Sequence, residues 1–311
     1  MYKITKNKLR SYFKSKDLKN FSLDYNIDAI YDKKIEYGKK LILGTFVARS
    51  GTRWLCDIFN SHNSVTATVE RFMEAETFLR YVNYNSLPID LSGVYALLKN
   101  GIINDWKKSD LSVVFSPFFS HSIHQLSEVL KPKEFILAIT EPKFVVQSVY
   151  NKGVFKENYF YSNKEKVIGF QPHVGTKSSH FFSRVVPSGN DYEYWSNLTR
   201  IGKISWWGNK IISDIYLQIT KIDKKKVFIF DLALADQNYE YYYNLANQFN
   251  LFPKINERDF LLLKSKTVKK NDNSPHQWSH EENEEFERET SSWHKIYKNI
   301  YKNYKNFNTN S

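Results

Sequence analysis

Five consecutive residues, Arg49-Ser50-Gly51-Thr52-Arg53, combine the groups that a protein needs to hold a phosphate or sulfate. Arg49 offers a guanidinium fork that fits two anion oxygens, and Ser50 and Thr52 offer hydroxyl donors. Gly51 lets the main chain approach an anion closely. An apolar run precedes these residues and a helical pattern follows them. We therefore expect their N–H groups at a helix N-terminus, where anions bind favourably.

This loop departs from the pattern of ATP- and GTP-binding loops. A nucleoside-triphosphate loop requires Gly-x-x-x-x-Gly-Lys-Ser/Thr, and no Gly-Lys-Ser/Thr is present here. A P-loop nucleotide kinase stays an alternative interpretation, because VFIF followed by Asp231 resembles a strand that ends in a metal-binding Asp. Magnesium-dependent ATP binding would favour that alternative.

The elements that must position the loop are short apolar runs that alternate with helical patterns over more than 200 residues. Strands are expected at 41–47, 65–69, 111–115, 135–139 and 227–230. Helices are expected at 52–62, 120–130, 206–222, from Pro142 onward and from Ser279 onward, where Ser279 and Glu282 form a capping box. The alternation predicts a three-layer α/β fold with a mostly parallel sheet and helices on both faces.

The sequence predicts a short N-terminal arm and one large domain. Residues 1–20 hold seven Lys or Arg and one Asp, so 1–40 are predicted to form a basic N-terminal arm with one short helix. Residues 41–311 are predicted to form a single domain. Within it, residues 159–195 show no period and are expected to form an irregular insert.

Composition excludes several protein classes. Of 311 residues, 41% are hydrophobic and 25% charged, which excludes a wholly disordered or collagen-like chain. The one cysteine, Cys56, excludes a disulfide framework and a cysteine-rich zinc site. His276 and His280 are four residues apart but lack a third ligand, so no metal is predicted. We see no secretory signal and no apolar run long enough to span a membrane, and a cytoplasmic location is expected.

The net charge of +12 favours anionic partners. One interpretation is therefore a basic protein that binds nucleic acid or an acidic polymer, with aromatic side chains that stack on bases. We find no recognised nucleic-acid-binding motif, which argues against nucleic acid as the partner. Steeply salt-dependent binding without nucleotide affinity would favour this interpretation.

The segment LILGTFVARSGTRWLCDIFNSH resembles the nucleotide-binding segment of sulfotransferases that use 3′-phosphoadenosine 5′-phosphosulfate (PAPS). The pattern [KR]-[SG]-G-T-[TR]-x-L is matched from Arg49 to Leu55. A second family signature, a strand followed by R-[DN]-P and a Ser six residues after the Pro, is matched at Pro142 and Ser148. Ser116-Pro117 resembles the family's K-[ST]-P segment. The resemblance spans roughly residues 41–300, and its first motif is the most specific part.

The resemblance implies a P-loop-like fold of the bacterial or carbohydrate sulfotransferase type and transfer of a sulfuryl group from PAPS to a hydroxyl, without a metal. The acceptor is unidentified, with a carbohydrate as one candidate. Residues 49–53 with Trp54 are expected at the 5′-phosphosulfate end. Ser148 is expected at the 3′-phosphate. Thr140 stands where the family has an Arg that meets this phosphate. Lys143 and Lys152 are the candidates to compensate, and weak binding of the nucleotide is the alternative. Oligomeric state is not predicted.

The resemblance also suggests the catalytic residues. Arg49 is expected to stabilise the leaving phosphate. Glu70 is the first candidate for the general base, because it follows the second strand at a place where carbohydrate sulfotransferases often carry a Glu. His121 and His124 are the alternatives, because they follow Ser116-Pro117, near the position of a catalytic His in other family members.

Overall fold

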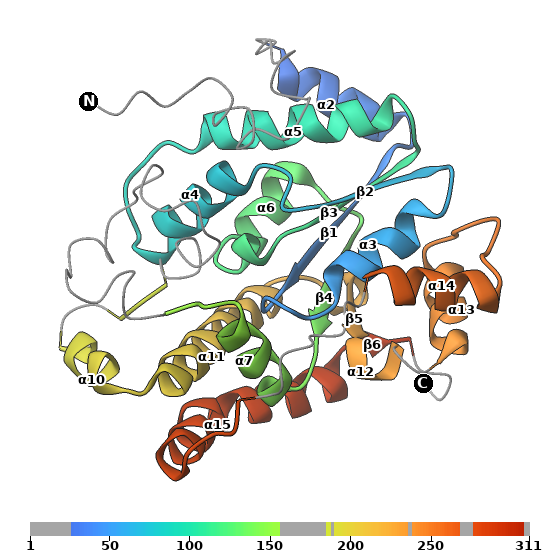
Figure 1. Cartoon of the computed structure of the whole chain (residues 1–311). Coiled ribbons are helices and arrows are strands. Elements are labelled where there is room, and N and C mark those ends of the chain that lie inside the picture. Colours follow the sequence, from blue (N-terminus) through green and yellow to red (C-terminus); the bar gives the residue numbers. More distant parts are fainter. Residues whose placement is uncertain (1–25, 156–184, 188–189, 236–237, 268–275, 308–311) are drawn as a thin grey trace, which may run out of the picture.

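The computed structural model describes residues 26–155, 185–187, 190–235, 238–267 and 276–307. Its centre is a six-stranded sheet in the order β2-β3-β1-β4-β5-β6 (Figure 1). Every neighbouring pair of strands in this sheet is parallel. The predicted three-layer α/β fold is confirmed, and all five predicted strands are present.

The strands alternate along the chain with helices, as the sequence predicts. Strands span Lys40–Phe46 (β1), Val65–Val69 (β2), Leu111–Phe115 (β3), Glu134–Ile139 (β4), Val227–Asp231 (β5) and Lys305–Asn306 (β6). Helices span Ile27–Glu36 (α2), Thr52–Asn60 (α3), Met73–Tyr84 (α4), Ser92–Trp106 (α5), Ile123–Leu130 (α6), Pro142–Asn151 (α7), Asp191–Asn197 (α10), Arg200–Ile219 (α11), Leu232–Ala235 (α12), Tyr239–Gln248 (α13), Glu257–Thr267 (α14) and His280–Asn303 (α15). Short 3₁₀ turns lie at Pro117–Phe119 (η2) and Lys224–Lys226 (η3).

Both faces of β1, β3, β4 and β5 are buried, which explains why these strands are mostly continuous apolar runs, whereas the edge strand β2 alternates, as VTATV. Side chains of successive residues point to opposite faces of a strand. In β1, Leu41 and Leu43 belong to one hydrophobic cluster, and Ile42 and Phe46 belong to the other. The middle of the sheet is therefore covered twice, and helices must pack on both sides of it.

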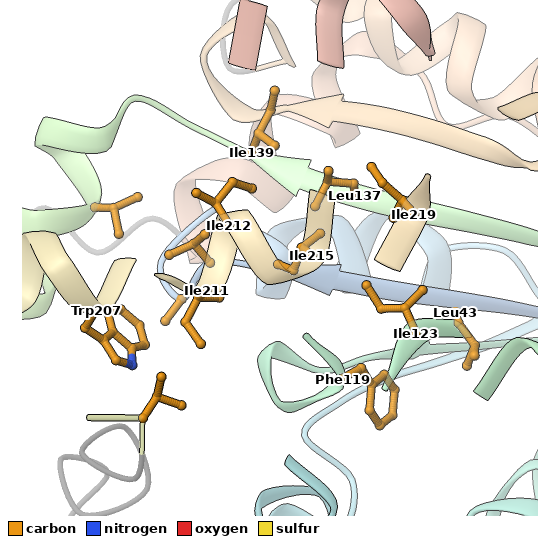
Figure 2. Close-up of a cluster of buried hydrophobic side chains, with 14 of the residues drawn as sticks. Leu43, Phe119, Ile123, Leu137, Ile139, Trp207, Ile211, Ile212, Ile215 and Ile219 are labelled. Atoms are coloured by element: carbon orange, nitrogen blue, oxygen red, sulfur yellow. The ribbon is translucent and has the colours of Figure 1, made fainter. Parts of the chain in front are cut away.

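The two helical layers differ in size. The larger layer includes α2, α5, α6, α7, α11 and α15, and the smaller one includes α3, α13 and α14 (Figure 1). Figure 2 shows how α11 contributes to the larger layer: Ile212 and Ile215 lie near Leu137 and Ile139 of β4. α15 begins with the predicted capping box, in which the Ser279 side chain and Glu282 satisfy each other's backbone N–H groups.

The edges of the predicted domain differ from expectation. α2 lies inside the predicted arm, yet Tyr31 is fully buried and its hydroxyl donates to the Leu130 carbonyl at 2.7 Å. Residues 27–36 are therefore packed against the domain. α10 lies at the end of the predicted irregular insert and buries Tyr192 and Trp195. Residues 1–25 and 156–184 lie outside the described part of the chain. Within that part, every helix is too short or too polar to cross a lipid bilayer.

Candidate active site

The loop between β1 and α3 is folded by its own side chains. The Ser50 hydroxyl is fully buried and donates to the Val47 carbonyl at 2.7 Å. We had expected this hydroxyl to face an anion, but it closes the turn instead. Thr52 is also buried, at the first turn of α3.

Two residues of the loop adopt left-handed backbone conformations, Arg49 with φ 79° and Gly51 with φ 74°. A glycine avoids the strain of positive φ at Gly51, and a Cβ there would lie 2.4 Å from Leu232 Cδ1, so the Leu232 side chain would have to move. Arg49 carries a side chain in this region, which costs on the order of 1–3 kcal/mol and is typical of functional sites. The sequence therefore accepts backbone strain to place this guanidinium.

Arg49 and Ser148 meet across the site. The Arg49 Nε donates to the Ser148 Oγ at 2.8 Å, although the two residues are 99 positions apart. Their contact follows from topology: β1 and β4 are neighbouring parallel strands, and the elements that follow them leave the same edge of the sheet. Pro142 occupies the first turn of α7, as predicted, and Ser148 is buried one and a half turns further on.

Glu70 lies at the same edge, directly after β2. Its backbone has φ 52°, and its N–H donates to the Phe115 carbonyl at 2.9 Å, which ties it to the end of β3. Burial raises the pKa of the Glu70 carboxyl, while the charges of Arg53, Arg49 and Arg80 oppose this rise. The predicted base is therefore close enough to the loop to interact with both of its arginines.

The arginines define an electropositive site around this carboxylate. Burial lowers the pKa of Arg49, the charge of Arg53 adds to this effect, and Glu70 opposes it. Arg53 is exposed in the first turn of α3, where the helix N–H groups have no intrahelical acceptors. Arg80 is fully buried, with its Cζ 4.7 Å from the centre of the Phe118 ring. The arrangement suits an anionic group held between the loop and Glu70.

Glu76 is a buried carboxyl that the sequence analysis missed. Its Oε1 accepts the Phe72 N–H at 3.0 Å, and its Oε2 accepts the Ser116 hydroxyl at 2.7 Å. Burial raises the pKa of Glu76 to about 7, and the charge of Glu70 contributes to the rise. Ser116 also accepts the Phe118 N–H at 3.1 Å, so the Ser116-Pro117 segment caps a 3₁₀ turn and holds Glu76. Since Glu76 and Ser116 are 40 residues apart, no local pattern could have paired them.

His121 is engaged through both ring nitrogens. Its Nε2 lies 2.6 Å from Asp214 Oδ2, and its Nδ1 lies 2.9 Å from Ser120 Oγ. Burial lowers the pKa of His121, and Asp214 opposes this. Burial alone would raise the pKa of Asp214, but His121 and Lys210 bring it below its usual value. A histidine held in this way links η2 to α11 and is less available as a base than Glu70.

The remaining predicted residues contact other side chains. His124 is partly exposed, 3.8 Å from Glu128. The Trp54 ring is buried in the core, 5.2 Å from Phe260, so it does not face outward from the loop. Lys143 lies 5.1 Å from the centre of the Trp278 ring.

At the position of the family's Arg, the structure has a buried threonine. The Tyr297 hydroxyl donates to the Thr140 carbonyl at 2.8 Å. This contact fixes the end of β4 against α15. The backbone of Thr140 thus has a structural partner where the family has a phosphate ligand.

Asp231, the residue that supports the kinase alternative, is used within the protein. Its Oδ1 accepts the Ala233 N–H at 2.8 Å, and its Oδ2 accepts the Tyr301 hydroxyl. In the described ranges, no group of three or more His, Cys, Asp or Glu side chains is arranged to hold a metal ion. Asp231 therefore acts as an anchor for the C-terminal part of α15.

No protein-family model matches this chain, and no curated protein is significantly similar to it. The function must therefore be argued from the geometry of the site and from the motifs in the sequence.

Proposed function

We propose that this protein is a sulfotransferase that moves a sulfuryl group from PAPS to a hydroxyl of an acceptor. The observation that carries the proposal is the hydrogen bond between Arg49 and Ser148. These two residues belong to the two separate signatures by which the sequence resembles PAPS-dependent sulfotransferases. The topology brings both signatures to one edge of the sheet, and their matching side chains meet there at hydrogen-bond distance.

Arg49 is suited to the leaving group of this reaction. A guanidinium has five N–H donors, and one of them is used on Ser148, so four remain for phosphate oxygens. Its charge and the N–H groups at the start of α3 would stabilise the negative charge that develops as the sulfur–oxygen bond to the phosphate breaks. Ser148 would hold the nucleotide's 3′-phosphate through its hydroxyl.

Glu70 is suited to the acceptor. Its carboxylate would take the proton from the acceptor hydroxyl while that oxygen forms the new bond to sulfur. Partial burial raises the pKa of Glu70 and makes it a better base, and the nearby arginines keep it ionised. Positioning and electrostatic stabilisation then supply most of the rate, as in phosphoryl transfer.

The test is calorimetric titration with adenosine 3′,5′-bisphosphate, the expected product. The wild-type chain should bind it. Arg49→Ala removes hydrogen bonds to charged groups, typically worth about 1.5–3 kcal/mol, and should weaken binding roughly 10- to 100-fold. Lys108→Ala removes an exposed positive charge from the opposite edge of the sheet and should leave the affinity unchanged. Absence of binding by the wild type, or tighter binding of Mg²⁺-ATP, would contradict the proposal.

Glu70 is tested separately from nucleotide binding. Glu70→Gln keeps the shape of the side chain and removes the base, so bisphosphate affinity should persist. Sulfate transfer from PAPS to a mixed polysaccharide pool should fall by about 10²–10⁴-fold. A variant with wild-type turnover would remove Glu70 from the mechanism and leave the nucleotide site intact.

A further inference from the structure

Lysines gather at the edge of the sheet opposite the candidate active site. Because all six strands are parallel, their first residues share one edge (Figure 1). Five neighbouring strands, β3, β1, β4, β5 and β6, each have exposed lysines at or within four residues of their start. Apart from Lys131, which pairs with Asp32 at 2.9 Å, this lysine row consists of Lys107, Lys108, Lys40, Lys133, Lys224, Lys225, Lys226 and Lys305.

The row is broad and mostly uncompensated. Neighbouring strands lie about 4.8 Å apart, so five of them place the lysines along roughly 20 Å. Lys133 forms a salt bridge with Glu134 at 3.2 Å. Within the ranges that the structure describes, no carboxylate lies within salt-bridge distance of the other members. Lys107 donates instead to the neutral Asn104 side chain at 2.9 Å.

The two edges of the sheet carry different kinds of basic side chain. Arg49, Arg53 and Arg80 surround Glu70 at the site edge, where planar guanidinium forks fit individual anionic groups. The opposite edge presents lysines, which are compact charges on flexible stems and attract a negative surface without a fixed geometry. The lysine row is thus suited to a broad anionic surface and not to a single phosphate.

Two exposed apolar side chains lie in segments that lead to the starts of β1 and β5. Tyr37, which is 73% exposed, lies between α2 and the start of β1. Leu217, which is 60% exposed, lies in the last turn of α11, the helix that leads toward β5. Tyrosine is enriched at membrane–water interfaces, where its ring meets the headgroups. Exposed apolar groups beside positive charges favour a lipid surface over a nucleic acid or an acidic polymer.

We propose that the lysine row docks this protein on the surface of an anionic phospholipid bilayer, with Tyr37 and Leu217 at headgroup level. Electrostatic attraction supplies the affinity, since each lysine near such a surface contributes about 1 kcal/mol, or about fivefold in partitioning. The candidate active site then faces away from the bilayer. The inference is independent of the reaction proposed above.

The test is co-sedimentation of the full chain with vesicles of phosphatidylcholine, with and without about a third phosphatidylserine. Binding should require phosphatidylserine and should disappear as salt rises from 0.1 to 1 M, because the screening length falls from about 10 to about 3 Å. Two double variants, Lys107→Gln/Lys108→Gln and Lys225→Gln/Lys226→Gln, should each lower the partition coefficient about 25-fold.

The matched control is Lys295→Gln/Lys298→Gln, which removes the same charge from an exposed part of α15 and should keep most of the binding. An equal loss in all three double variants would mean that net charge acts without a docking face, and would overturn the proposal. So would equal binding to both kinds of vesicle. Tight binding to heparin without vesicle binding would assign the row to an acidic polymer and also overturn it.

Discussion

Glu76 makes a quantitative prediction that needs neither donor nor acceptor. Its carboxyl is fully buried between Phe72 and Ser116, and burial raises its pKa from an ordinary 4.5 to about 7. Between these pH values the folded protein binds a proton that the unfolded chain releases. Stability therefore falls as pH rises through this window. At 1.36 kcal/mol per pKa unit, the Glu76 contribution that is lost by pH 8 is about 3 kcal/mol.

The perturbation is Glu76→Gln, which keeps the size of the side chain: its Oε1 can accept the Phe72 N–H, and its Nε2 can donate to the Ser116 hydroxyl oxygen. The variant cannot ionise, so its stability lacks this decline. The free energy of unfolding of the variant minus that of the wild type should rise by about 3 kcal/mol between pH 4.5 and pH 8. The difference isolates Glu76 because other titrating groups are common to both proteins.

Urea denaturation followed by tryptophan fluorescence at pH 4.5, 6, 7 and 8 would measure this difference. The control is Glu287→Gln on the exposed side of α15, for which the difference should stay flat across the same range. If the difference in unfolding free energy between Glu76→Gln and the wild type did not change with pH, Glu76 would have the same pKa in the folded protein as in the unfolded chain. Burial would then not be the dominant influence on the Glu76 carboxyl.

Three further predictions concern the frame of the site. Gly51→Ala should lower the free energy of unfolding, measured by urea denaturation, by more than 1 kcal/mol, because alanine is strained at positive φ and its Cβ would meet Leu232. Adding Leu232→Ala should restore part of the lost stability. Burial lowers the pKa of His121, so the folded protein loses stability as pH falls below about 6.5, and His121→Gln should remove that decline in thermal unfolding. Tyr301→Phe removes a hydrogen bond to the buried Asp231 carboxylate and should cost about 1.5–3 kcal/mol in the same assay, whereas an unchanged melting temperature would show that the bond adds nothing.

The sheet could be predicted because its signals are local. Four of the five predicted strands are short, mostly apolar runs that are buried on both faces, and the fifth, β2, is the β-branched segment VTATV. The order of the strands was not predicted. It depends on which helix covers which face, and the two clusters that separate Leu41 from Ile42 become visible only in three dimensions.

Several elements gave too weak a signal. β6 has two residues and pairs with β5 at Lys305 and Asn306, so no periodicity could reveal it. α5 has apolar residues around much of its circumference, since it packs against α2 as well as the core, and it shows no clear stripe. α4 was not predicted either, so Glu76, which lies in its first turn, was not singled out as a candidate.

The site residues also differ in whether their signal is local in the sequence. The loop from Arg49 to Arg53 could be found because its chemistry is contiguous in sequence, and Glu70 because it follows a recognisable strand. The Ser50 hydroxyl was misjudged, because only the folded turn shows that the Val47 carbonyl needs it.

The structure adds a reason why Glu70 and Glu76 must be considered together. Glu70 is held at the end of β2 by the Phe115 carbonyl, and Ser116, the next residue, holds Glu76. The end of β3 therefore positions both carboxyls, and the charge of one raises the pKa of the other. A proton taken up by Glu70 would favour ionisation of Glu76, and its release would reverse this. Glu70→Gln should therefore lower the pKa of Glu76, because it removes the negative charge that opposes ionisation of Glu76. The pH dependence of the free energy of unfolding of Glu70→Gln tests this coupling, since its decline should begin at a lower pH than in the wild type. A decline over the wild-type pH range would show that the two carboxyls act independently.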